Sequence, residues 1–265
     1  SRSRRMPRLP TLFVSHGSPM HALDAGGAGP AWEALAASLP RPRAILVASA
    51  HWETQLPMLT GGERLETIHD FRGFPPGLYR VRYDVDSLPA LGARAAALLQ
   101  AAGLPASVNA CRGIDHGAWV PLKWMYPARD VPVVQLSIQT GLGAAHHLQL
   151  GEALAALREE GVLVIGSGHV THNLRDWSVH RGDPAPADYV VQFAAWLDEK
   201  LARGERDELL AWRERAPSAE RAHPTEEHFL PLFVALGAAG PGAAATRVYS
   251  AIDAGVLSMD AYRFD

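Results

Sequence analysis

Four histidines in this chain each follow a short apolar run that is typical of a buried strand. They are His16 after residues 11–15, His51 after residues 44–50, and His169 and His172 shortly after residues 162–166. In an open α/β sheet, ligands bind outside the carboxyl ends of the strands. Imidazole is the commonest metal ligand and the usual proton carrier near neutral pH. The repeated position therefore predicts a metal site or an acid–base site.

Two of these histidines lie three residues apart in a glycine-rich segment. His169 and His172 follow Gly166 and Gly168, which let the chain turn sharply after a strand. If the segment is helical, both rings could bind one ion. If it is a loop, only one of them faces the site. The sequence pattern leaves both alternatives open.

A further histidine has a carboxylate as its immediate neighbour. Asp115 precedes His116 and Gly117. The pair is compatible with a tuned general acid or base. The alternative is an aspartate turn before a helix that begins near Trp119.

Another histidine lies in an acidic stretch near the C-terminal end of the sequence. His228 follows Glu226 and Glu227 and precedes Pro231. Because proline disrupts a helix interior, we expect a turn that carries His228 and a helix that begins after Pro231. The two glutamates favour a helix start, where negative charge is stabilising.

Composition bounds the class of protein. Of the 265 residues, 48% are hydrophobic, and the net charge of −3 gives no basic field for nucleic acid. No apolar run approaches the roughly 20 residues of a membrane span. Cys111 is the only cysteine, which excludes an internal disulfide and fits a reducing compartment. We therefore expect a cytoplasmic protein that binds neither nucleic acid nor membrane. Its oligomeric state stays open.

Strand-like and helical patterns alternate along the chain. The predicted strands are 11–15, 44–50, 131–138 and 162–166, with weaker candidates at 79–84, 106–109 and 246–250. The predicted helices are 30–39, 88–102, 144–160, 188–203 and 225–236. Continuous apolar strands between helices predict an α/β fold with a central, mostly parallel sheet flanked by helices. The active site is expected at the carboxyl ends of its strands.

The remaining segments complete the expected organisation. Residues 1–9 carry a basic cluster and are predicted to form a flexible leader, followed by one domain over residues 10–265. Residues 61–83, 173–187 and 204–224 are irregular and are expected to wall the pocket at the strand ends.

The clusters together resemble one family. The motifs are His-Gly-Ser-Pro-Met at 16–20, Ser-Ala-His-Trp at 49–52, Thr-Ile-His-Asp-Phe at 67–71, Gly-Phe-Pro at 73–75, Asp-His-Gly at 115–117, Val-Gln-Leu-Ser-Ile at 134–138, His-Asn-Leu-Arg at 172–175 and Pro-Thr-x-Glu-His at 224–228. In this order they look like the bacterial and plant DOPA 4,5-dioxygenases, which are class III extradiol ring-opening dioxygenases.

The resemblance implies roles for individual residues. The family's metal ligands correspond to His16, His51 and His228. His172 matches a catalytic base or additional metal ligand, and His116 matches a residue that assists substrate binding and proton transfer. The implied reaction opens a catechol ring with O₂ at one divalent metal ion per chain, beside the two hydroxyl groups.

The identity of the metal stays open. The usual non-haem iron site has two histidines and one carboxylate, whereas three imidazoles also describe catalytic zinc. Glu226 or Glu227 could supply a carboxylate. Fe(II) is the ion expected for dioxygenase activity, and Zn(II) is an alternative bound ion. Two other functions also stay open: a zinc-dependent hydrolase, and a non-enzymatic binding protein similar to Memo-type proteins.

The predicted substrate is a catechol with a short polar side chain, such as DOPA. Residues 69–80 offer aromatic side chains for the ring, and His69 is a candidate contact. Arg175, or alternatively Arg72, could pair with a carboxylate on the substrate. The sequence does not name the physiological catechol.

Overall fold

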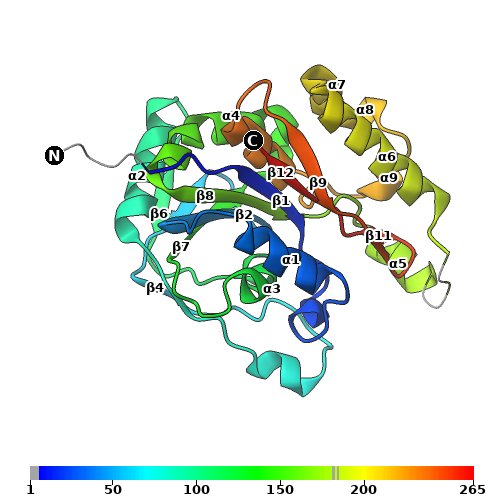
Figure 1. The fold of residues 1–265 in the computed structure, drawn as a ribbon, viewed down its shortest axis with the longest axis horizontal. Coiled ribbons are helices and arrows are strands. Elements are labelled where there is room, and N and C mark those ends of the chain that lie inside the picture. The colour runs from blue at the N-terminus through cyan, green and yellow to red at the C-terminus, as the bar shows by residue number, and fades with distance from the viewer. Residues whose placement is uncertain (1–5, 181–182, 184) are drawn as a thin grey trace.

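An eight-stranded sheet crosses the centre of the molecule (Figure 1). The structure is a computed structural model that describes residues 6–180, 183 and 185–265. In spatial order the strands are β6 (Ser107–Asn109), β3 (Met58–Thr60), β7 (Val133–Ile138), β2 (Ala44–Glu53), β8 (Val162–Gly168), β1 (Thr11–Ser15), β12 (Ala261–Phe264) and β9 (Ala245–Tyr249).

The four central strands run parallel. β2 pairs with β7 on one side and β8 on the other, and β8 pairs with β1, all in parallel register. Antiparallel strands extend the sheet on both sides, where β3 joins β7 and β12 joins β1. Parallel strands bring their carboxyl ends to one edge of the sheet, so His16 after β1 and His51 in β2 are carried to the same edge.

Alternating residues of the strands pack against helices on opposite faces. Ile45 and Val47 of β2 join the core cluster that contains helices α1 (Ala28–Ala37) and α3 (His116–Met125). Leu46 and Ala48 join the opposite cluster, with α2 (Pro89–Ala101), α4 (Gly143–Leu154) and α10 (Pro231–Ala239). Both faces are apolar because both are covered, which is typical of parallel sheets.

A third cluster lies where α10 meets a group of C-terminal helices. Phe193 of α6 (Asp188–Arg203) packs there with Phe229 and Phe233. The neighbouring helices are α5 (Leu174–His180), α7 (Arg206–Leu210), α8 (Trp212–Arg215) and α9 (Ala219–Ala222). Figure 1 shows α6 to α9 as a group at one side of the sheet. The two small sheets pair β4 (Arg64–Leu65) with β5 (Val85–Asp86), and β10 (Ile252–Asp253) with β11 (Leu257–Ser258).

The predicted fold class is confirmed as a single α/β domain with a large, mostly parallel sheet flanked by helices. The predicted helix after Pro231 is also confirmed, with Pro231 in its first turn. The weaker strand candidate at 79–84 is wrong, because Pro76–Arg80 forms a 3-10 turn and only Val85–Asp86 is a strand there.

Other segments differ from the prediction in detail. Residues 204–224 are largely helical, as α7, α8 and α9. Residues 1–5 of the predicted leader lie outside the described residues, whereas Leu9 is buried and its backbone N–H donates to the carbonyl of Arg158. Among the described residues, no helix has both the length and the apolar character that a membrane crossing needs.

Candidate active site

A cavity of about 750 Å³ opens at the carboxyl ends of the central strands. Its polar wall consists mainly of histidines, and its apolar wall comes from the loop after β4, from α5 and from β11. The lining residues used below are His16, His51, His116, His169, His172, Asp70 and Asp253. The cavity therefore lies at the carboxyl ends of the strands, where the sequence analysis expected the active site.

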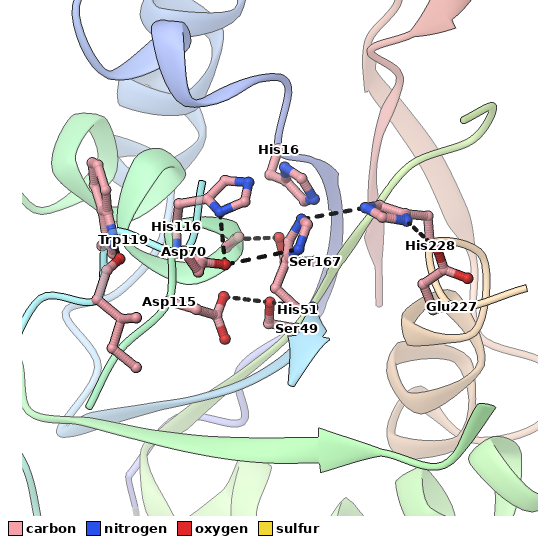
Figure 2. Close-up of polar contacts among 12 residues, drawn as sticks. His16, Ser49, His51, Asp70, Asp115, His116, Trp119, Ser167, Glu227 and His228 are labelled. Carbon is pink, nitrogen blue, oxygen red and sulfur yellow. Dashed lines mark hydrogen bonds and ion pairs between the residues drawn. The ribbon is translucent and has the colours of Figure 1, made fainter. Parts of the chain in front are cut away.

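Three imidazoles from distant parts of the chain converge beside this cavity (Figure 2). His16 follows β1, His51 lies in β2, and His228 lies in the turn before α10. One ring nitrogen from each lies within 4.8 Å of the other two. The ring centroids of His51 are 4.9 Å from those of both His16 and His228. This spacing suits three ligands of one ion.

Backbone groups decide which nitrogen His16 offers. Its Nδ1 lies 2.7 Å from the carbonyl oxygen of Gly17 and must donate to it, so Nε2 keeps its lone pair. That Nε2 is buried and has no hydrogen-bond partner among the described residues. A buried polar atom without a partner is costly. A metal ion would satisfy it, so His16 fits the role of a ligand.

His169 is held differently, although it lies in the same cavity wall. The backbone N–H of Gly17 donates to its Nε2 over 3.0 Å, so that lone pair is already used. Its Nδ1 then donates to the carbonyl of Ser258 at 3.2 Å. His169 therefore links the turn after β1 to the C-terminal segment and has no free nitrogen for an ion.

His51 and His228 face each other through their Nε2 atoms, which are 3.3 Å apart. Burial is the main cause that lowers the pKa of His51, to about 3, and it also lowers that of His228 well below the usual value. Neighbouring histidines add to both shifts. Metal ligands must be unprotonated, and these rings are held neutral before any ion binds.

Two glutamates near His228 have different surroundings. Glu227 Oε1 lies 3.4 Å from Nδ1 of His228, on the ring edge opposite Nε2, and Figure 2 shows this contact. Glu226 instead lies 3.8 Å from the guanidinium of Arg213. Glu227, with His172 and His228, also forms an alternative three-residue group that could hold an ion.

Asp70 is a site residue that the sequence reasoning missed. Its Oδ2 lies 2.9 Å from Nδ1 of His116, and its Oδ1 accepts the backbone N–H of His116 over 3.0 Å. Burial opposes ionisation of Asp70, but the hydrogen bonds and charge of His116 lower its pKa. Asp70 also lies 3.8 Å from His51. Asp70 belongs to the motif at 67–71, but the sequence does not show that it contacts His116.

His172 lies in the cavity wall and stacks on a candidate ligand. Its ring is parallel to that of His228, with centroids 3.5 Å apart and an interplanar angle of 7°. Burial, followed by the proximity of His116, lowers the pKa of His172 to about 4. A neutral imidazole in this position can accept a proton from a bound substrate.

Asp115, which precedes His116 in sequence, supports the site from outside the cavity. It is fully buried, and its carboxylate accepts hydrogen bonds from Ser49 at 2.7 Å and Arg112 at 3.2 Å, and another from Gln135. Ser49 in turn accepts the backbone N–H of His51. Asp115 therefore connects the start of α3 to the end of β2, and it does not line the cavity.

Two predicted substrate contacts lie elsewhere. His69 Nε2 donates to the carbonyl of Val81 over 2.7 Å, and the ring does not line the cavity. Arg175 is exposed on α5 and is also absent from the lining. Phe71 and Phe74 do line it, as the aromatic character of residues 69–80 predicts.

The chain matches known proteins over nearly its whole length. A family model described as the catalytic LigB subunit of aromatic ring-opening dioxygenase matches residues 10–254. The chain belongs to this family. It is 44% identical to a protein of Beta vulgaris named 4,5-DOPA dioxygenase extradiol, over 96% of both chains. A protein of Escherichia coli K12 with the same name is 41% identical, over 95% of this chain and 93% of its own.

A solved structure agrees. The crystal structure of an uncharacterized protein from Escherichia coli K12 has a TM-score of 0.83 and 36% identity, covering 97% of this chain and all of its own. The predicted family is therefore confirmed. The protein is an extradiol aromatic ring-opening dioxygenase, which uses a non-haem metal, a small aromatic substrate and O₂.

Proposed function

We propose that this dioxygenase opens a catechol with a short polar side chain, such as DOPA, at one divalent metal ion bound by His16, His51 and His228. The observation that carries the proposal is the convergence of three neutral imidazoles, of which His16 and His228 are buried and His51 is half-buried. The names of the relatives from Beta vulgaris and Escherichia coli support the substrate class.

Fe(II) is the ion that we propose for activity, and Zn(II) fits the same three imidazoles. When bound, Fe(II) supplies open coordination positions for the catechol and O₂. Glu227 is proposed to orient His228 through Nδ1, because it lies on the ring edge that faces away from His51. Carboxylates that hold the second nitrogen of a ligating histidine fix its orientation and raise its basicity.

His116 is proposed to move a proton through its Nε2 atom. Oδ2 of Asp70 lies 2.9 Å from Nδ1, and this nearby carboxylate favours the tautomer with its hydrogen on Nδ1, which leaves Nε2 as the nitrogen that can take a proton from a substrate hydroxyl. The carboxylate then stabilises the imidazolium that forms. The pairing resembles other sites in which an aspartate orients a catalytic histidine.

His172 is proposed as the second proton acceptor. Its stacked position on His228 keeps it next to the metal ligands, and the lowered pKa keeps it unprotonated at neutral pH. The apolar wall with Phe71 and Phe74 contacts the substrate ring and excludes water from it.

Oxygen uptake tests the proposal directly. Protein loaded with Fe(II) without air should consume O₂ when a panel of catechols is added, and the product spectra should show a ring opened beside the diol. A His16→Ala variant is the control without the complete ligand set. Absence of uptake with every catechol would contradict the proposed reaction.

The cytoplasmic location, predicted from the single cysteine, stays a prediction that cell fractionation can test.

A further inference from the structure

The cavity has a marked asymmetry of charge. Two carboxylates, Asp70 and Asp253, are among its lining residues, whereas no lysine or arginine of the described residues lines it. Asp70 is committed to His116. Among the described residues, Asp253 is therefore the cavity carboxylate that has no lysine or arginine beside it.

The one described ion-pair partner of Asp253 is His21. A backbone hydrogen bond determines which ring nitrogen of His21 carries the hydrogen. The backbone N–H of Ser18 donates to Nδ1 of His21 over 3.0 Å, so this nitrogen carries no hydrogen. His21 is therefore the neutral tautomer with its hydrogen on Nε2. That hydrogen is donated to Oδ2 of Asp253 over 2.7 Å. The contact orients the carboxylate but does not neutralise it.

Asp253 lies two side-chain contacts away from the candidate metal centre. Gly17 directly follows His16, and a Cβ atom on Gly17 would come within 2.6 Å of the His21 ring. The ring of His21 is thus packed against the turn that carries His16, and Asp253 lies at its other edge. Cavity space beside Asp253 is therefore continuous with space beside the metal ligands.

We propose that Asp253 binds an ammonium group on the side chain of the substrate and so makes the site prefer cationic catechols to anionic ones. The inference rests on the proposed function and deepens it by naming the charge of the substrate side chain. A catechol that binds with its hydroxyl groups towards His16, His51 and His228 can extend its side chain along the wall to Asp253. Apolar residues such as Phe74 and Leu257 line the wall and suit the ring and methylene groups.

The proposal replaces the expectation that an arginine binds a substrate carboxylate. Arg175 lies outside the lining, and a purely anionic side chain would meet Asp253 with no lysine or arginine of the described lining residues to offset the repulsion. Because 40% of the Asp253 side chain is exposed, water screens the interaction. The expected effect is therefore roughly tenfold in affinity, the size of one charge-assisted hydrogen bond in a partly open site.

Binding measured without turnover tests the proposal. The dissociation constants of dopamine, 4-methylcatechol and 3,4-dihydroxyphenylacetate are measured by calorimetry on Zn(II)-loaded protein without O₂. Asp253→Asn keeps an oxygen that can accept the hydrogen of His21, so the loop is preserved. Asp24→Asn is the matched control, because it removes the same charge from an exposed position on the segment that follows the Pro19–Ala22 turn and does not line the cavity.

The readout is the ratio of the dissociation constants of dopamine and 4-methylcatechol. In Asp253→Asn this ratio should rise roughly tenfold, and the penalty on 3,4-dihydroxyphenylacetate should shrink, whereas Asp24→Asn should leave both ratios as in the parent protein. An unchanged ratio in Asp253→Asn would overturn the inference. If the ratio shifts but Fe(II)-loaded protein consumes no O₂ with any catechol, the charge preference stands and the proposed reaction fails.

Discussion

At the scale of single residues, backbone hydrogen bonds distinguish histidines that otherwise look alike. His16 and His169 both lie in the cavity wall, but a carbonyl holds Nδ1 of His16, whereas an N–H occupies Nε2 of His169. The first ring is left with a free lone pair and the second is not. Ligand identity therefore follows from the partners of each ring, and sequence spacing alone could not supply them.

Removal of any one of the three proposed ligands should empty the metal site. His16→Ala, His51→Ala and His228→Ala should each lose most of the bound divalent metal, because two imidazoles rarely hold such an ion against chelators. Metal content per chain, measured by mass spectrometry after dialysis, checks this. His146→Ala is the control, since His146 contacts Gln139 and lies outside the cavity lining. Full occupancy in all three variants would refute the ligand set.

The two proton-transfer histidines should matter for rate rather than for folding. His172→Ala and His116→Ala should keep their melting temperature within a few degrees and lose about 10²–10⁴-fold in kcat, the usual contribution of a positioned acid or base. Steady-state oxygen uptake with a good catechol measures it. A variant with unchanged kcat would remove that histidine from the mechanism.

Asp70→Asn separates positioning from ligation. The asparagine amide carries no negative charge that could stabilise a protonated His116. The kcat should therefore fall about 10–100-fold, while metal occupancy is largely kept. The pH–rate profile should also move, which a purely structural residue would not cause. Loss of metal in proportion to activity would instead place Asp70 among the ligands, as its 3.8 Å distance from His51 allows.

Most residues of the candidate site could be predicted from the sequence, because each histidine lies in a recognisable motif and the motifs follow a characteristic order. Strand-end position identified His16, His51, His169 and His172, and acidic neighbours drew attention to His116 and His228. The family resemblance then assigned roles to five of these six histidines, all except His169. Asp70 could not be assigned in the same way, because its role depends on contact with a residue 46 positions later. For the same reason Asp253 had no sequence signal, since it approaches His21 only in the folded chain.

At the scale of elements, the site depends on close contact between β8 and the turn that carries His228. The backbone N–H of His169 donates to the carbonyl of His228 over 2.8 Å. A Cβ atom on Gly168 would lie 2.0 Å from that same carbonyl oxygen. Only glycine lets the strand approach the turn this closely, and this approach places His228, the third proposed ligand.

Gly168→Ala should therefore affect both stability and metal binding. The added methyl must push the turn away, which we expect to cost roughly 1–3 kcal/mol in the free energy of unfolding, together with reduced metal occupancy. Urea unfolding and metal analysis measure the two effects. Gly77→Ala is the control, because a Cβ at Gly77 meets no atom within 4 Å. Equal stability of the two variants would contradict the expectation.

The elements that the sequence predicted well are long and buried on both faces. β2 and β8 are of this kind, with continuous apolar runs. The missed strands β3 and β12 are short and pair at the sides of the parallel core, where local pattern carries little information. The wrong strand at 79–84 has alternating residues, but Pro75 and Pro76 set a 3-10 turn just before it.

At the scale of the whole molecule, buried neutral histidines link stability to pH. His147 is fully buried, accepts the backbone N–H of Gln139 and donates to the carbonyl of Gly143. Burial lowers its pKa from 6.5 to about 4. The unfolded chain therefore binds a proton that the folded chain rejects between these two pH values. Stability from this residue is complete above pH 6.5 and is lost as the pH falls towards 4.

The metal-free protein should accordingly be less stable at pH 5 than at pH 7. His147 alone should account for about 2 kcal/mol of that difference. A His147→Gln variant should show a pH dependence that is smaller by this amount, although its stability at pH 7 is also reduced. Urea unfolding at the two pH values provides the comparison. An identical pH dependence in the variant would mean that folding does not lower the pKa of His147.

The candidate ligands His16 and His228 lie 212 positions apart in the sequence, yet their ring centroids are only 5.4 Å apart. A chain emerging from the ribosome cannot assemble this centre until His228 has been made, long after His16. Metal delivery is then confined to the period after synthesis, when the cell's exchangeable metal pool, rather than the order of translation, decides which ion is captured. Expression in iron-rich and zinc-rich media should therefore yield the same fold with different ions.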